Sequence, residues 1–246
     1  MKKIIGLLLL SSFSIFAAPN NNITYDEVID ILEEDISSFQ RSILLSDKKN
    51  TCYHLGRVEQ LSSLLQKDIE TQISQRSLKR SIRRQMRKIK RKSRDKTKFC
   101  SNKFRLLFGG LERNRISRRM DKAQKKLKRF EDKAPSTTVY SLNSMQLIDH
   151  LISISEKRPT YVADRVSYQR FKPEACYFVG TTSSQIDLLE RALSDSLKES
   201  KYFVSLQKSI NTVKLDVCRG YYMENTFNKH TKRILENAIK LKDLIQ

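Results

Sequence analysis

Helix-breaking residues are rare in this chain, with 6 glycines and 4 prolines among 246 residues. Apolar residues recur instead at steps of three and four, the spacing of one face of an α-helix. The clearest stripe follows Thr24 and Glu27, which have the spacing of a helix-capping box. The stripe consists of Val28, Leu32, Ile36, Phe39 and Ile43. The sequence therefore predicts an all-α, mainly helical fold.

The helical period returns in several later regions. One stripe runs from Leu55 to Ile73, a short helix is expected around Met145 to Ile152, and the last third returns to helix from Ile186 to Ile245. Residues 160–171 have no clear helical period. They are interpreted as a loop or a short strand.

A short pattern, Cys-Tyr-x-x-Gly, occurs twice at a shift of 124 residues, over 52–56 and again over 176–180. Leucines and isoleucines further along align at the same shift, so we expect a diverged internal duplication. Two helical segments that share leucines by chance are the alternative. The expected halves are a strongly basic one, residues 18–134, and a near-neutral one, residues 135–246.

The four cysteines predict two disulfides in an exported protein. Equivalent halves would pair Cys52 with Cys100 and Cys176 with Cys218, and bridges between the halves remain the alternative. An unbroken helix would hold the first two cysteines about 65 Å apart, whereas a disulfide needs Cα atoms within about 7 Å. Pairing within the halves therefore requires helical hairpins, with turns near 75–77 and 199–201.

The first 17 residues resemble a secretory signal peptide. Lys2 and Lys3 precede an apolar run from Ile4 to Leu10, and Ala17 and Ala18 offer small residues for cleavage. An uncleaved anchor is the alternative, but the run is shorter than the roughly 20 residues that cross a bilayer. We expect an exported protein that is periplasmic or extracellular.

Positive charge is concentrated between Arg76 and Lys133, which hold 25 Lys or Arg and 5 Asp or Glu, a net charge of +20. The rest of the expected mature chain has 21 basic and 22 acidic residues. A block of like charge repels itself and favours an anionic partner. The basic residues surround two expected helices, the second over about 111–133 and ended by Pro135. The candidate anion-binding residues are Arg76, Lys79, Arg80, Arg83, Arg84, Arg87, Lys88, Arg91, Arg115, Arg118, Arg119, Lys122, Lys125 and Lys126.

Arginine forks suit phosphate oxygens, so the expected partner is an anionic polymer or a membrane surface. Lipid phosphate, lipopolysaccharide, another envelope polyanion and nucleic acid all have this chemistry. Few aromatic residues lie among the basic ones, and no DNA-binding motif occurs, so base-specific recognition is not expected. A module that docks an acidic protein is the alternative, and a solvated basic face without a ligand is the simplest interpretation.

No catalytic signature is present. The histidines, His54, His150 and His230, are far apart in sequence, and no phosphate loop or nucleophile elbow occurs. Zinc bound through Cys52 and His54 is disfavoured because no close pair of cysteines accompanies them. We therefore expect no enzyme activity, no metal and no cofactor, and the sequence indicates neither the ligand nor the oligomeric state.

Overall fold

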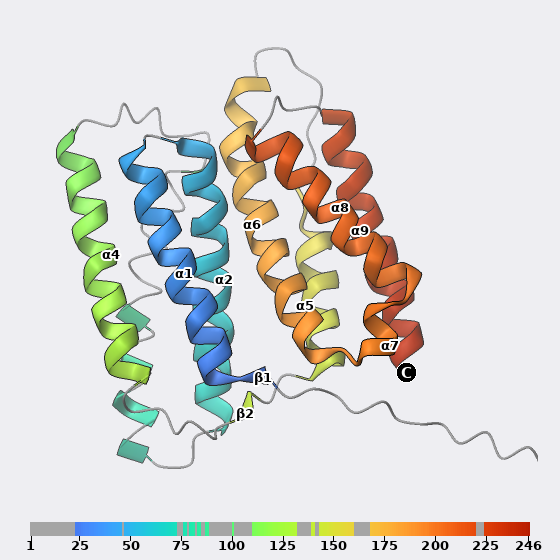
Figure 1. The fold of residues 1–246 in the computed structure, drawn as a ribbon, viewed down its shortest axis with the longest axis horizontal. Coiled ribbons are helices and arrows are strands. Elements are labelled where there is room, and N and C mark those ends of the chain that lie inside the picture. The colour runs from blue at the N-terminus through green and yellow to red at the C-terminus, as the bar shows by residue number, and fades with distance from the viewer. Residues whose placement is uncertain are drawn as a thin grey trace, which may run out of the picture.

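The computed structural model describes residues 23–45, 47–72, 110–131, 139–140, 143–159, 168–219 and 224–246. It also describes Cys100 and, between 76 and 88, residues 76, 77, 79–81, 83, 84, 87 and 88. This part of the chain is mainly α-helical, which confirms the predicted fold class (Figure 1). The expected signal peptide lies outside the described residues.

The described helices and strands follow one another along the chain in this order. They are β1 (Ile23–Thr24), α1 (Tyr25–Leu44), α2 (Lys48–Gln72), α4 (Gly110–Glu131), β2 (Val139–Tyr140), α5 (Ser144–Glu156), α6 (Tyr168–Ala192), α7 (Asp195–Lys198), α8 (Lys201–Val213), the π-helix η1 (Lys214–Arg219) and α9 (Glu224–Ile245). The two short strands pair antiparallel, with Ile23 opposite Tyr140 and Thr24 opposite Val139. The ladder therefore ties the start of α1 to the segment before α5.

The start of α1 follows the sequence closely. The Thr24 hydroxyl accepts a hydrogen bond from the Glu27 backbone N–H, and the Glu27 carboxylate accepts one from the Thr24 N–H at 2.8 Å. This is the predicted capping box, and all five residues of the predicted apolar stripe on α1 are buried. The start of α6 differs, because residues 168–171, expected to be loop or strand, are helical.

The helices share one hydrophobic core that extends through both halves of the chain. Figure 1 shows α1, α2 and α4 on one side and α5, α6, α8 and α9 on the other. Helix α2 of the first group packs against α6 of the second, and this contact joins the two groups. No helix within the described ranges is both long and apolar enough to cross a bilayer.

The two copies of the Cys-Tyr-x-x-Gly pattern meet where α2 crosses α6. A Cβ atom on Gly56 would lie 2.2 Å from the Tyr177 carbonyl oxygen, and one on Gly180 would lie 1.9 Å from the Tyr53 carbonyl oxygen. The helices therefore touch backbone to backbone, which glycine permits because it has no side chain.

The tyrosines of the two copies make matching contacts across this crossing. The Tyr53 hydroxyl lies 3.0 Å from the Ser183 hydroxyl, and the Tyr177 hydroxyl donates to the Glu59 carboxylate at 2.7 Å. Residues 59 and 183 are related by the same shift of 124 as the tyrosines. The crossing is thus close to twofold symmetric, while the internal duplication itself stays a prediction.

A buried ion cluster joins α1, α2 and α6. Nε of Arg57 lies 2.7 Å from both carboxylate oxygens of Asp35, and its Nη1 donates to Asp187 at 2.5 Å. Arg57 is 9% exposed and Asp35 4%. His54 Nδ1 lies 3.0 Å from the same Asp35 carboxylate. His54 therefore belongs to this cluster, and Cys52 is in a disulfide, so the two do not form the zinc pair considered above.

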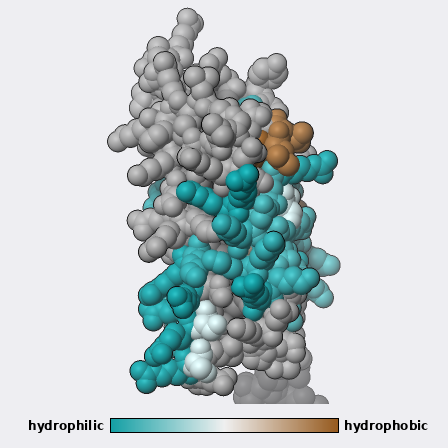
Figure 2. Space-filling model, turned by 90° about the vertical axis from the view of Figure 1, so that its left-hand side faces the viewer, coloured by the Kyte–Doolittle hydropathy of each residue, from teal (hydrophilic) through white to brown (hydrophobic). Residues whose placement is uncertain are grey.

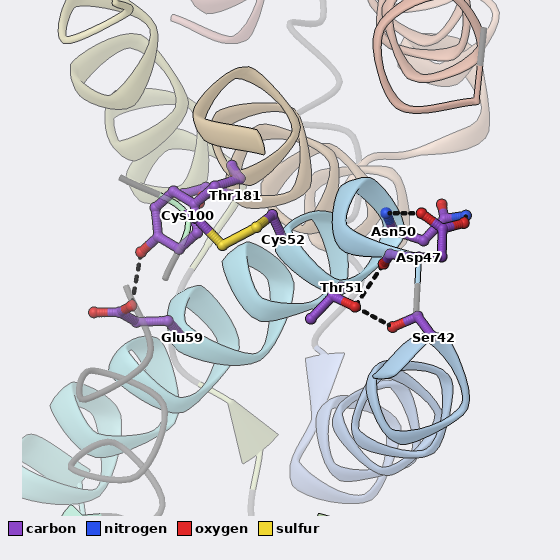
Figure 3. The surroundings of a disulfide bond; sticks show 9 residues. Ser42, Asp47, Asn50, Thr51, Cys52, Glu59, Cys100 and Thr181 are labelled. Carbon is purple, nitrogen blue, oxygen red and sulfur yellow. Dashed lines mark hydrogen bonds between the residues drawn. A yellow bond between two sulfur atoms is a disulfide. The ribbon is translucent and has the colours of Figure 1, made fainter. Parts of the chain in front are cut away.

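The Cys52–Cys100 disulfide is present, with Cα atoms 5.7 Å apart (Figure 3). The chain between them reverses, because Arg83 Nε lies 2.9 Å from Glu70 Oε1. In a continuous helix those residues would be about 20 Å apart along the axis. The predicted turn near 75–77 lies partly outside the described residues, and residues 76 and 77 are helical.

The second predicted disulfide is not formed, and both remaining cysteines are buried free thiols. The hairpin itself is confirmed, because Ser200 caps α8 at the predicted turn and the chain returns to bring Cys218 beside Cys176. The Cys176 thiol donates to the Val217 carbonyl oxygen at 3.5 Å. Its sulfur therefore makes a hydrogen bond where a covalent bond was expected.

Candidate anion-binding site

Helix α4 is fixed to α1 by a small apolar and polar contact. Ala123 and Leu127 are fully buried. Two side-chain hydrogen bonds, each 2.7 Å long, connect the helices, from Gln40 to Asp121 and from Gln124 to Ser37. These contacts fix which face of α4 points away from the core.

Four basic residues form a stripe on the outer face of α4, here called the α4 stripe: Arg118, Lys122, Lys125 and Arg129. All four are exposed. At about 100° per residue, they lie within about 60° of one another and about 150° from the buried Ala123 and Leu127. The stripe spans about 16 Å of helix. Figure 2 looks onto this side of the molecule and shows mainly hydrophilic side chains there.

A second basic cluster surrounds a hollow of about 350 Å³, here called the arginine hollow. Its lining residues are Arg80, Arg83, Arg84, Arg87 and Lys88. Glu70, from the last turns of α2, pairs with Arg83 and so anchors one side of the hollow. A hydrogen bond from Gln66 and the charges of Arg83 and Arg87 hold the pKa of Glu70 below its usual value.

The structure describes most of the sequence candidates. Exposed candidates are Arg76, Arg80, Arg84, Arg87, Lys88, Arg118, Arg119, Lys122 and Lys125, and half-buried ones are Lys79, Arg83 and Lys126. Arg91 lies outside the described residues, as does the side chain of Arg115. Five of the candidates line the arginine hollow, and three belong to the α4 stripe. Arg129 was missed, although its spacing from Lys122 and Lys125 would have indicated it.

The chemistry of both clusters is that of oxyanion recognition. A guanidinium presents several N–H donors in a planar fork that matches phosphate, sulfate and carboxylate groups. Glu70 supplies one negative charge to a hollow lined by five positive side chains. An anion that entered the hollow would therefore relieve repulsion among the remaining cations.

No known protein family, curated protein or solved structure is detectably similar to this chain. Within the described residues, no group of three or more His, Cys, Asp or Glu side chains is placed to hold a metal ion.

Proposed function

We propose that this protein is exported and binds an anionic polymer or surface through the arginine hollow and the α4 stripe. The observation that carries the proposal is the arginine hollow, where four arginines and a lysine between residues 80 and 88 line one space. A solvated basic helix needs no concave site, whereas a ligand with several oxyanions fits one.

The two clusters suit a ligand with many charges better than a single small anion. The α4 stripe sits on a helix that its apolar contacts and hydrogen bonds hold in place. Each exposed cation then contributes a weak, additive contact to a polyanion, with little dependence on ligand sequence and a steep dependence on salt.

Export is supported by two independent features. The Cys52–Cys100 bridge is a chemistry typical of oxidising compartments. The N-terminal sequence has the pattern of a secretory signal. Expression in a bacterial host, followed by cell fractionation and mass spectrometry, tests this part, and a protein that stays in the cytoplasm with Lys2 and Lys3 intact would contradict it.

Binding is tested with long-chain polyphosphate, duplex DNA and vesicles containing anionic lipid, each over a salt series. The hollow variant replaces Arg80, Arg84 and Arg87 by glutamine and leaves the Arg83–Glu70 pair intact. We expect its plot of log affinity against log salt to be shallower by about 2–3 units, because each lost contact removes about 0.7–0.9.

A matched control removes three exposed charges from α8 and α9, by replacing Lys208, Lys229 and Arg233 with glutamine. This variant has the same net charge as the hollow variant. Equal loss of affinity in both would show that net charge alone drives binding. A wild-type protein that binds none of the probes near 150 mM salt, yet captures an acidic protein, would favour the protein-docking alternative.

A further inference from the structure

A separate polar pocket of about 340 Å³ lies between α2 and α5. Its lining is rich in uncharged hydrogen-bonding side chains, including Gln60, Gln66 and Ser153. Lys67, Glu70 and His150 complete its polar wall. The charges of Lys67 and Glu70 offset each other, so this pocket differs in character from the arginine hollow.

Contacts within the pocket hold most of its polar groups in place. Lys67 Nζ lies 3.2 Å from His150 Nε2. Gln60 donates to the fully buried Gln185 at 3.0 Å, and Gln185 donates to the Leu147 carbonyl oxygen at 2.9 Å. These groups come from α2, α5 and α6, so the wall of the pocket is rigid.

One buried acceptor in this wall has no hydrogen-bond donor among the described residues. Gln66 uses its amide N–H group on Glu70, at 3.1 Å, while its Oε1 atom is buried without a hydrogen bond. A buried acceptor left unpaired costs free energy. Oε1 itself is not exposed, so a ligand reaches it only when the Gln66 side chain shifts toward the pocket. An oxyanion would then gain nothing, because it only accepts hydrogen bonds, whereas a hydroxyl or an amide N–H can donate to Oε1.

His150 adds to the uncharged character of the pocket. Burial and the neighbouring Lys67 charge lower the pKa of His150, while Asp149 opposes the shift. The ring is therefore neutral near pH 7, with Nε2 able to accept from Lys67. The pocket thus presents neutral donors and acceptors, together with one positive and one negative charge, both from α2.

The pocket and the arginine hollow meet at one ion pair. Glu70 lines the pocket, and its carboxylate pairs with Arg83, which lines the hollow. A ligand that fills both would present oxyanions on one side of this pair and hydroxyl or amide groups on the other.

We propose that the polymer is an anionic glycan, whose sulfate, phosphate or carboxylate groups enter the hollow while sugar hydroxyl or acylamino groups fill the pocket. This inference rests on the proposed function and narrows its ligand. No Phe, Tyr or Trp side chain stands among the described residues that line either space. The bases of a nucleic acid would therefore find only the His150 ring and the arginine guanidinium planes to stack on, whereas single-strand binding sites use large aromatic side chains.

The test compares heparin, which has sulfates, hydroxyls and acylamino groups, with polyphosphate, which has charge alone. We expect Gln66→Met to weaken heparin binding about tenfold, because a hydrogen bond to a buried group is lost, and to leave polyphosphate binding unchanged. Ser153→Ala, on the α5 wall and away from Glu70, should act in the same direction. Gln207→Met on α8 is the matched control and should change neither.

The outcomes separate this inference from the proposed function. If Gln66→Met and Ser153→Ala spare heparin binding, or weaken both ligands equally, the glycan assignment is overturned while polyanion binding stands. Single-stranded DNA that binds more tightly than heparin and loses affinity in the same variants would overturn it in favour of nucleic acid. A wild-type protein that binds neither heparin nor polyphosphate would overturn both proposals.

Discussion

Replacing Gly56 with alanine puts a methyl group where α2 and α6 touch. The new Cβ would lie 2.2 Å from the Tyr177 carbonyl oxygen and 3.0 Å from the backbone nitrogen of Thr181. Real Cβ contacts do not fall below 3.0 Å, and a helix carbonyl cannot rotate aside. The two helices must therefore separate by about 1 Å, a gap that forfeits roughly a quarter to a half of the dispersion energy of facing atoms.

The expected cost follows from two opposing terms. Overpacking of this kind costs about 1–3 kcal/mol and sometimes more, while alanine in place of glycine gains about 1 kcal/mol of helix propensity. Because the clash at 2.2 Å is with backbone, we expect the upper end of the overpacking range, about 3 kcal/mol, and therefore a net loss of about 2 kcal/mol. In a chain of this length that lowers the melting temperature by about 4–8 °C.

Thermal and urea unfolding, followed by circular dichroism at 222 nm, measure this loss. Gly180→Ala should behave in the same way, since its Cβ would lie 1.9 Å from the Tyr53 carbonyl oxygen. The double variant should lose less than the sum of the two single losses, because one separation relieves both clashes. A Gly56→Ala protein that is as stable as wild type, or more stable, would refute the backbone contact.

Three further predictions concern buried groups. Arg57→Met leaves the Asp35 carboxylate buried beside His54 and should cost about 3–5 kcal/mol in urea unfolding; a loss below 1 kcal/mol would contradict a buried pair. Burial, together with the Asp68 carboxylate, raises the pKa of Tyr25. The native state then keeps a proton that the unfolded chain releases above about pH 10, so stability should fall as pH rises, by about 1.4 kcal/mol per unit. Tyr25→Phe should flatten that fall, and identical slopes in both proteins would count against it. Burial also raises the pKa of the Cys218 thiol, so iodoacetamide at pH 8 should label it slowly until urea unfolds the protein; rapid native labelling would show that the thiol is accessible.

Most of the correct predictions came from sequence patterns that extend over only a few residues. The capping box at Thr24 and Glu27 involves atoms three residues apart, and the stripe on α1 repeats within each turn, so both depend on nearby residues alone. The hairpin between Cys52 and Cys100 followed from the length of a helix and the reach of a disulfide. The short strands β1 and β2 were missed, because two residues each give no alternation to detect.

The sequence identified which residues are candidates for anion binding, but it did not show which distant residues would contact them. Charge counting indicated the region from 76 to 133, since the net charge of a segment does not depend on its fold. Steps of three and four also placed Arg80, Arg83 and Arg87 on one helical face, but they did not indicate that Glu70 would pair with Arg83. That pair depends on a chain reversal that places residues 13 positions apart side by side.

Helical content, the start of α1 and the uneven distribution of charge were determined by the amino-acid sequence alone, because each arises within a few turns of chain. The repeat at Gly56 and Gly180 was visible in the sequence, but only the packing of α2 on α6 decided that the two copies meet. Only the tertiary structure likewise decided that Cys176 and Cys218 stay unbridged and that Gln66 of α2 and His150 of α5 line one pocket. A helical period shows which face of a helix is apolar, but the partner of that face is chosen by the energy of the whole core.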